Sequence, residues 1–134
     1  MIPPASEVVE RARSLIGARF RPHGRDPRGY DCVGVAAYAL GLPEETVPRG
    51  YGLRGSSVEA VGAFLVGVGL TRVAFRRPGD IAVHLAGPAQ LHLGVLTGAD
   101  FVHADIALAR VVERPWPPPW PLLGLWRPLL AEVR

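Results

Sequence analysis

Apolar and polar residues alternate with two different periods along this chain of 134 residues. In the first half, apolar positions recur at helical spacing, which predicts helices over 6–16, 32–40 and 60–68. From Thr71 onward the period changes to two, which is typical of strands. The expected strands are 71–75, 81–85, 91–97, 100–104, 108–113 and 123–130. Helices first and strands second favour an α+β fold with an antiparallel sheet over a parallel sheet.

Capping and stop residues indicate where these helices begin and end. The expected pairs are Ser6 and Gly17 for the first helix and Asp31 and Gly41 for the second, with a Ser-Ser-Val-Glu capping box at 56–59 for the third. The stretches 18–30 and 42–55 are dense in turn-forming residues, so we expect a loop and an irregular connection there.

The segment 115–121, with the sequence Pro-Trp-Pro-Pro-Pro-Trp-Pro, lacks the backbone donors that a central strand needs. We expect a stiff edge segment that wraps apolar surface, followed by a strand over 123–130 that closes the sheet. No repeat, linker or second domain interrupts the pattern, which predicts a single domain over 1–134.

Composition and charge exclude several classes of protein. Hydrophobic residues make up 49% of the chain, enough for a buried core, and the single cysteine rules out an internal disulfide or a multi-cysteine metal site. All 15 basic residues are arginines, and they are dispersed rather than clustered, so no nucleic-acid patch is indicated. The net charge of +3 would suit a polyanionic substrate such as a bacterial cell wall.

Neither the N-terminal residues nor the longest apolar stretch resembles a targeting signal or a membrane span. The N-terminal residues do not show the basic and apolar regions of a secretory signal. The longest apolar stretch, 58–70, carries Glu59 and is too short to span a bilayer. We therefore expect a protein made in the cytoplasm without a signal peptide and with no membrane span.

Cys32 is the first candidate for chemistry, because it stands where a loop meets a helix. Asp31 is a plausible N-cap, so the thiol would meet unpaired backbone N–H groups and the positive end of the helix dipole. Both favour the thiolate, the form that attacks carbonyl groups. The alternative is that Cys32 is a small buried apolar residue.

Strand geometry selects two histidines as partners for this thiol. The loop Gly98-Ala99 favours a type II′ hairpin turn, which pairs Gly94 with His103 and puts His92 on the same face. The two histidines then become diagonal neighbours, about 7–8 Å apart at the backbone. Gly94 would leave room for the two rings to approach. Two imidazoles on one face can supply a base and an orienting group for a thiol nucleophile.

Other interpretations of the histidines stay open at this point. The pair of His92 and His103 is either catalytic with Cys32, incidental, or part of a zinc site that would need Cys32 as a further ligand. We favour the catalytic interpretation. His84 lies inside an apolar strand and is interpreted as a core or edge residue. His23 lies in the loop before Cys32, where it is either solvated or part of the site.

Several short motifs together resemble one known family. They are Asp-Cys-Val-Gly at 31–34, Arg-Pro-Gly-Asp at 77–80, His-Leu-Gly-Val at 92–95, Phe-Val-His-Ala at 101–104 and Trp-Arg-Pro at 126–128. In this order and spacing, the motifs look like the NlpC family, the papain-like cysteine peptidases of bacterial cell walls. The resemblance implies a papain-like fold in which N-terminal helices pack on a C-terminal antiparallel sheet, with the nucleophilic cysteine at a helix N-terminus.

The resemblance also implies roles for individual residues. It makes Cys32 the nucleophile, His92 the general base and His103 the residue that orients the base. It implies no metal and no other cofactor. The expected activity is hydrolysis of amide bonds in peptidoglycan stem peptides through a thioester on Cys32.

Further residues around the cysteine follow from the same resemblance. Asp31 and Arg21 are candidates for substrate binding. Many members of the family carry a tyrosine ahead of the cysteine, whose hydroxyl polarises the scissile carbonyl. This chain has Phe20 in that loop, so we expect His23 to take over the task.

The stretch Arg-Pro-His-Gly-Arg at 21–25 looks most like the cell-wall peptidases of bacteriophage tails and gene-transfer agents. That branch implies phage-like tail proteins as partners, and delivery to the cell wall or periplasm inside the tail particle. Two alternatives stay open. One is a structural or assembly module of a tail tip that keeps the fold without turnover, and the other is a thiol acyltransferase.

Overall fold

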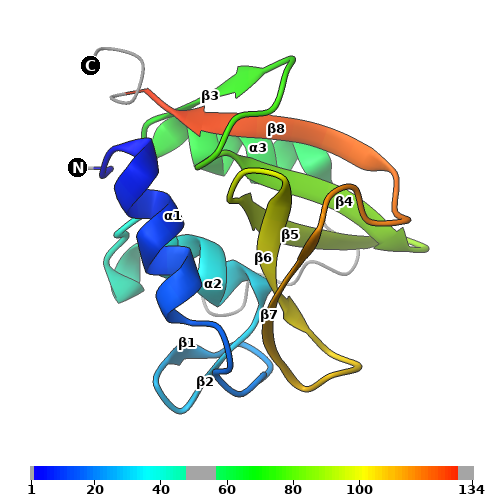
Figure 1. Ribbon diagram of the computed structural model, residues 1–134. Helices are drawn as coiled ribbons and strands as arrows, with labels where there is room; N and C mark the ends of the chain where they lie inside the picture. Colours follow the sequence, from blue (N-terminus) through cyan, green and yellow to red (C-terminus); the bar gives the residue numbers. More distant parts are fainter. Residues whose placement is uncertain (1, 48–56, 130–134) are drawn as a thin grey trace.

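The computed structural model describes residues 2–47 and 57–129, in which helices pack against one antiparallel sheet (Figure 1). The helices are α1 (Ala5–Ser14), α2 (Cys32–Ala39) and α3 (Val58–Gly67), with a 3-10 turn η1 (Glu44–Thr46). The strands are β1 (Arg25–Asp26), β2 (Gly29–Tyr30), β3 (Leu70–Val73), β4 (Ile81–Gly87), β5 (Gln90–Leu96), β6 (Asp100–Asp105), β7 (Arg110–Pro115) and β8 (Leu122–Pro128). The predicted α+β class is confirmed.

The strands of the main sheet run in the order β3-β8-β4-β5-β6-β7, and every neighbouring pair is antiparallel. Strand β8 therefore lies inside the sheet, and the prediction that 123–130 would close it at an edge is wrong. The proline-rich segment lies at the sheet edge only at Pro115, the last residue of the edge strand β7, and then connects β7 to the inner strand β8. An ion pair helps to hold β8 in place, because Arg127 Nε donates to the fully buried carboxylate of Asp80 at 2.8 Å.

Two of the predicted helix starts need correction. Helix α1 begins after Pro4, whose carbonyl accepts hydrogen bonds from the N–H groups of Glu7 and Val8, so Ser6 lies inside the helix and is not its cap. At α3 the cap is Ser57, whose hydroxyl accepts from Ala60 N at 3.1 Å. Residue 56 lies outside the described residues, as does most of the connection predicted to be irregular. The loop predicted over 18–30 contains the small hairpin of β1 and β2.

The three helices share one face of the sheet, where the main apolar core lies (Figure 1). Strands β4, β5 and β6 supply Val83, Leu91, Leu93, Val95, Val102 and Ala104, and the helices supply Val8, Val35, Leu40, Val61 and Leu65. These side chains alternate along each strand with residues that face the other way, as a period of two requires. The core therefore fixes which strand residues are left for the opposite face.

The opposite face carries a smaller apolar cluster together with the histidines. The cluster consists of Ala82, Leu96, Phe101 and Leu125. The hairpin register is as predicted, since Val95 pairs with Val102 and Leu96 with Phe101. Gly94 does make room for a ring, but for Phe101 and not for His103: a Cβ at Gly94 would lie 2.9 Å from Phe101 Cδ2.

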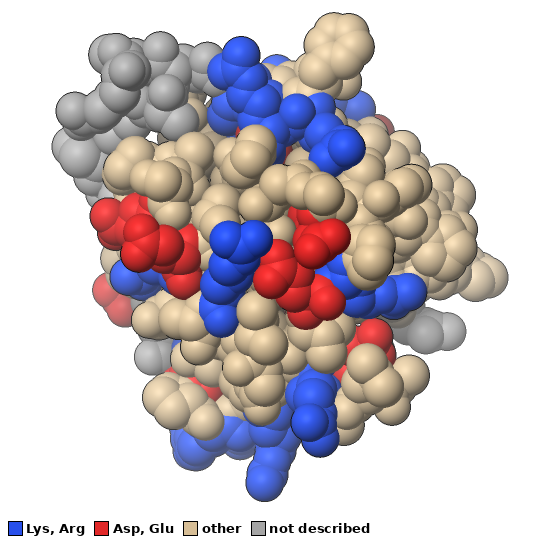
Figure 2. Space-filling view, viewed as in Figure 1, with Lys and Arg blue, Asp and Glu red and all other residues tan. Residues whose placement is uncertain are grey.

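The surface shows no single-sign field over the face seen in Figure 2. Arginines and acidic side chains lie side by side across its middle, which agrees with the dispersed arginines of the sequence. Within residues 2–47 and 57–129, no helix is long and apolar enough to cross a membrane.

Candidate active site

Cys32 is the first residue of α2, as predicted, and Asp31 is its N-cap. The Asp31 carboxylate accepts hydrogen bonds from Gly34 N at 2.7 Å, from Arg25 Nη1 at 2.7 Å and from His23 N at 3.0 Å. One carboxylate thus ties the helix start to the loop before it. This tie holds Cys32 at a fixed position, because the residue next to it is anchored in three directions.

The loop approaches the helix so closely that a side chain at one position would clash. A Cβ at Gly34 would collide with the carbonyl oxygen of Gly24, which explains a glycine in the first turn of α2. Arg25, on the same loop, has only 2% of its side chain exposed. This buried arginine was not predicted, because nothing in the spacing of a loop indicates which side chains it buries.

The thiol of Cys32 is buried, which changes its chemistry from what the sequence suggested. The pKa of Cys32 is raised to about 12, mainly by burial and in smaller part by the nearby Asp31 carboxylate. The backbone N–H groups of Leu93 and Val33 and the charge of Arg25 act in the opposite direction, but they do not cancel the burial. The expected lowering of the thiol pKa is therefore wrong for this closed arrangement, because desolvation outweighs the helix end.

His92 and His103 lie on one face of the sheet and contact each other, as the register predicted. His92 Nε2 lies 2.7 Å from His103 Nδ1, and the ring centroids are 4.9 Å apart. One of these nitrogens donates and the other accepts, depending on the tautomers. The contact leaves Nδ1 of His92 as the nitrogen available for another partner.

The thiol of Cys32 contacts β5 at Leu93, the position next to His92. The sulfur of Cys32 accepts from the N–H of Leu93, the residue that directly follows His92. Helix α2 packs against the face of β5 that carries Leu93, whereas the His92 side chain lies on the other face. Within the described residues no hydrogen bond joins Cys32 to His92. Proton transfer between them requires that the two groups come within hydrogen-bond distance, directly or through a water molecule.

Burial also keeps the histidines of this face neutral. Burial and, in smaller part, His103 lower the pKa of His92 to about 3, and burial lowers the pKa of His103 to about 4. The same cause lowers the pKa of His84 to about 4. At neutral pH the resting site therefore holds a thiol and neutral imidazoles, which are bases with a free electron pair and not imidazolium ions.

The proline-rich segment covers these histidines with a tryptophan. The ring centroid of Trp120 lies 5.1 Å from that of His92, 5.8 Å from that of His103 and 6.1 Å from that of His84. The predicted wrapping of apolar surface was thus right in kind. The sequence did not indicate that the wrapped surface includes the candidate catalytic histidines, because a proline-rich segment has no periodicity that would show its path.

The other candidate residues differ in burial and in their contacts with the site. His84 is buried at 1% exposure, which agrees with its interpretation as a core residue. His23 is exposed, with φ at 58°, and only its backbone N–H contacts the site. Arg21 is exposed as well. The structure does not bring the His23 ring or the Arg21 guanidinium into a contact with Cys32, so their substrate roles stay predictions.

The zinc interpretation finds no support. Among residues 2–47 and 57–129, no group of three or more His, Cys, Asp or Glu side chains is arranged to hold a metal ion. The nitrogen of His92 that faces His103 is engaged in the contact between the two rings.

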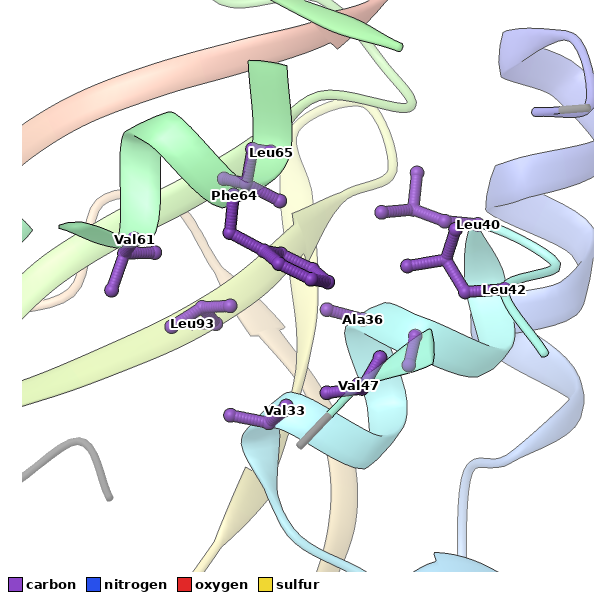
Figure 3. Close-up of a pocket in the computed structure, with 10 residues that line it drawn as sticks. Val33, Ala36, Leu40, Leu42, Val47, Val61, Phe64, Leu65 and Leu93 are labelled. Atoms are coloured by element: carbon purple, nitrogen blue, oxygen red, sulfur yellow. The ribbon is translucent and has the colours of Figure 1, made fainter. Parts of the chain in front are cut away.

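An apolar cavity lies between α2, α3 and β5 (Figure 3). It is lined by Val33, Ala36, Ala37, Leu40, Leu42, Val47, Val61, Phe64, Leu65 and Leu93. Figure 3 shows the Phe64 ring between α3 and α2. The cavity measures about 30 Å³, and because its lining is apolar we expect it to stay dry.

A cysteine at a helix N-terminus, packed against an antiparallel sheet that carries a histidine pair, is the arrangement of the papain-like fold. Comparisons with known proteins show which papain-like structures the chain resembles. No protein-family model matches the sequence, and no curated protein matches it either. Solved structures do match, and several of them are NlpC or P60 domains.

Three of these structures show the extent of the likeness. NlpC2 from Trichomonas vaginalis has a TM-score of 0.69 and 18% identity, over 93% of this chain and 46% of that chain. The P60 domain of an antigen from M. avium subspecies paratuberculosis has a TM-score of 0.62 and 18% identity, over 93% of both chains. The peptidoglycan hydrolase RipB from Mycobacterium tuberculosis has a TM-score of 0.62 and 20% identity, over 93% of this chain and 64% of that chain.

The chain spans less than half the length of the two Trichomonas vaginalis proteins that it matches, 44% and 46%. At these identities the likeness establishes the fold. The chain therefore has the NlpC/P60 fold, as the sequence motifs implied.

Proposed function

We propose that this protein is a cysteine peptidase that hydrolyses amide bonds in the stem peptides of peptidoglycan. The observation that carries the proposal is the meeting of Cys32, at the start of α2, with the strand position next to His92, whose ring is paired with His103 at 2.7 Å. The NlpC/P60 fold supports it, because the solved structures with this fold include proteins described as peptidoglycan hydrolases.

The resting state determines how the reaction would begin. Since the thiol and both imidazoles are neutral, His92 acts as a general base through Nδ1 and takes the thiol proton as the sulfur attacks the scissile carbonyl carbon. The proton then passes to the leaving amine, and the acyl group stays on Cys32 as a thioester. A water molecule, deprotonated by His92, attacks the thioester and releases the acid.

Donors near the sulfur would stabilise the oxyanion of these steps. The N–H groups of Val33 and Leu93 already point at the sulfur, and we include His23 as a further donor that would swing toward the carbonyl oxygen. Asp31 and Arg21 would bind the charged groups of the stem peptide. Removing one such donor typically costs about 2.7–4 kcal/mol of transition-state stabilisation.

The proposal also includes the setting in which the enzyme works. The stretch 21–25 resembles tail-associated peptidases, which supports delivery to the cell wall inside a phage-like tail by tail proteins. We further propose that residues 1–134 act as one peptidase domain.

Digestion of purified peptidoglycan, followed by mass spectrometry of the soluble products, tests the activity. We expect new stem-peptide fragments from the wild type, background levels from Cys32→Ala and His92→Ala, and a milder loss from His103→Ala. Wild-type levels of product from all three variants would show that the cysteine site is not responsible. A folded wild type that releases nothing would favour the structural tail-tip module, and capture of the acyl group by an added amine would identify an acyltransferase.

A further inference from the structure

A carboxylate lies beside the nitrogen of His103 that does not contact His92. Asp105 follows His103 by two positions on β6, so the two side chains share one face of the sheet. Asp105 Oδ2 lies 3.8 Å from His103 Nε2. That nitrogen is buried and makes no hydrogen bond in the structure, although only 1% of the His103 side chain is exposed.

The other oxygen of this carboxylate is held by the backbone. Leu108 N donates to Asp105 Oδ1 at 3.0 Å, which closes the turn between β6 and β7. Arg114 Nη1, on β7, lies 3.8 Å from Oδ2. Oδ1 is therefore occupied by the turn, and Oδ2 is directed at the space between His103 and Arg114.

We propose that Asp105 is a positioning residue that sets the tautomers of both histidines and so makes His92 Nδ1 the basic atom of the site. The inference rests on the proposed function only in taking His92 as the general base. This role follows from which ring nitrogens of His92 and His103 can carry protons.

The contact between His92 Nε2 and His103 Nδ1 holds a single proton, so two arrangements exist when both rings are neutral. In the first, His103 carries its proton on Nε2, facing Asp105, and its Nδ1 accepts from His92 Nε2. His92 Nδ1 then has a free electron pair. In the second, every proton sits on the other nitrogen, and His92 Nδ1 is protonated and cannot act as a base.

The carboxylate selects the first arrangement. At 3.8 Å the separation is longer than a direct hydrogen bond, so Asp105 acts through its negative charge on the N–H dipole of His103. Such charges act strongly where burial lowers the effective dielectric constant. In the second arrangement two electron pairs, those of Nε2 and of Oδ2, would face each other without a proton between them.

The other titratable and charged groups around the pair do not reverse this choice. His84 on β4 is neutral, Cys32 on α2 is protonated, and Trp120 carries no charge. Arg114 on β7 opposes Asp105, since it disfavours a proton on the imidazoles, but it lies beside the carboxylate and is partly exposed at 37%. Asp105 is the one acidic group that faces His103 among the contacts of the described residues.

Two substitutions at Asp105 separate this role from that of a turn residue. The side chain introduced by Asp105→Asn keeps an oxygen for Leu108 N, but its amide would donate to His103 Nε2 and reverse both tautomers. This variant should therefore lose about 10²-fold in kcat/KM. Asp105→Ala removes the charge and the turn contact without imposing the wrong tautomer, so it should lose less. If the residue served only the turn, the order would be opposite, with the asparagine variant the milder one.

The tautomers themselves can be measured without a substrate. Nitrogen-15 NMR of the imidazoles in the full chain, at neutral pH, reports which ring nitrogens are protonated. We expect protons on His103 Nε2 and His92 Nε2 in the wild type, and on both Nδ1 atoms in Asp105→Asn. Protonated Nδ1 atoms in the wild type, or unchanged tautomers in Asp105→Asn, would overturn the inference even if the protein hydrolyses peptidoglycan.

Arg114→Gln provides the matched control. It removes the guanidinium charge that lies 3.8 Å from Asp105 Oδ2. The tautomers of both histidines should stay as in the wild type. A reversal in this variant would show that the tautomers respond to any change in the β7 side of the site, and that Asp105 has no special part in them. An inactive wild type with the expected tautomers would contradict the proposed function and leave the positioning role intact.

Discussion

The two faces of the sheet differ in what they bury. On the helix face, Leu93 and Val95 enter a core of aliphatic side chains that leaves only a small dry cavity. On the opposite face, His92 and its neighbours bury polar nitrogens, and two of these, His84 Nδ1 and His103 Nε2, have no hydrogen-bond partner. Because residues alternate between the faces along one strand, β5 takes part in both environments.

The difference shows a division between stability and chemistry within the same strands. Aliphatic packing is favourable at every contact, whereas a buried nitrogen without a partner costs free energy. Polar groups that are buried at such a cost are common where their reactivity is used. The helix face thus holds the sheet in shape, and the histidine face is where we propose that the chemistry takes place.

Adjacent residues on β5 allow the sharpest test of this division. His92→Ala should reduce peptidoglycan turnover to background and keep most of the thermal stability, because its side chain supplies chemistry. Leu93→Ala should lower the free energy of unfolding by about 2–5 kcal/mol through the cavity that it leaves. Unfolding curves and turnover assays on both variants check this. A large loss of stability in His92→Ala with a small one in Leu93→Ala would reverse the assignment of the two faces.

The pH dependence of thiol alkylation tests how deeply the site is buried. With the pKa of Cys32 raised to about 12, little thiolate exists at neutral pH, so labelling by iodoacetamide should be slow there and rise steadily in alkaline solution. His92→Ala should change this profile little, since the imidazole of His92 is neutral throughout that range. Mass spectrometry of the single thiol measures the rate, with urea-unfolded protein as the reference. Fast labelling below pH 7 would instead reveal a thiolate–imidazolium pair.

The smallest effect concerns the pH dependence of stability. Burial lowers the pKa of His84 from 6.5 to about 4, so between these values the unfolded chain binds more protons than the folded one. The stability linked to His84 is therefore fully present above about pH 6.5 and is lost as the pH falls toward 4. His92 and His103 act in the same direction.

A phenylalanine would fit the aromatic surroundings of His84, which include Phe101 and Trp116. His84→Phe should thus reduce the decrease in Tm between pH 7 and pH 5 by removing one of three buried titrating rings. His23→Phe, at an exposed loop position, is the control and should leave the decrease unchanged. If the decrease in Tm between pH 7 and pH 5 were the same in His84→Phe as in the wild type, other groups would govern the loss of stability in acid.

The sequence predicted those features that depend on local periodicity. The two-residue turn at Gly98 was enough to fix the register of β5 and β6, and hence the shared face of His92 and His103. Asp31 as the cap of α2 followed from a loop-to-helix junction in the same way. Asp105 could also have been found, because it follows His103 by two positions on a predicted strand.

The remaining features depend on how distant segments meet. The burial that raises the pKa of Cys32 comes from packing between α2 and β5, which no local pattern contains. The position of Trp120 over His92 depends on the path of a proline-rich connection. The place of β8 inside the sheet depends on pairing with two strands that precede it by a long stretch of chain.

The position of β8 inside the sheet has a consequence for folding during synthesis. Since β8 pairs with both β3 and β4, a nascent chain on the ribosome carries these two strands with unpaired edges until β8 has emerged. Pairing across so much intervening chain is slow, because the loop must close before its contacts form. We therefore expect the partly synthesised chain to be prone to aggregation, and the last strand of the sheet to act as the step that commits the domain to its native state.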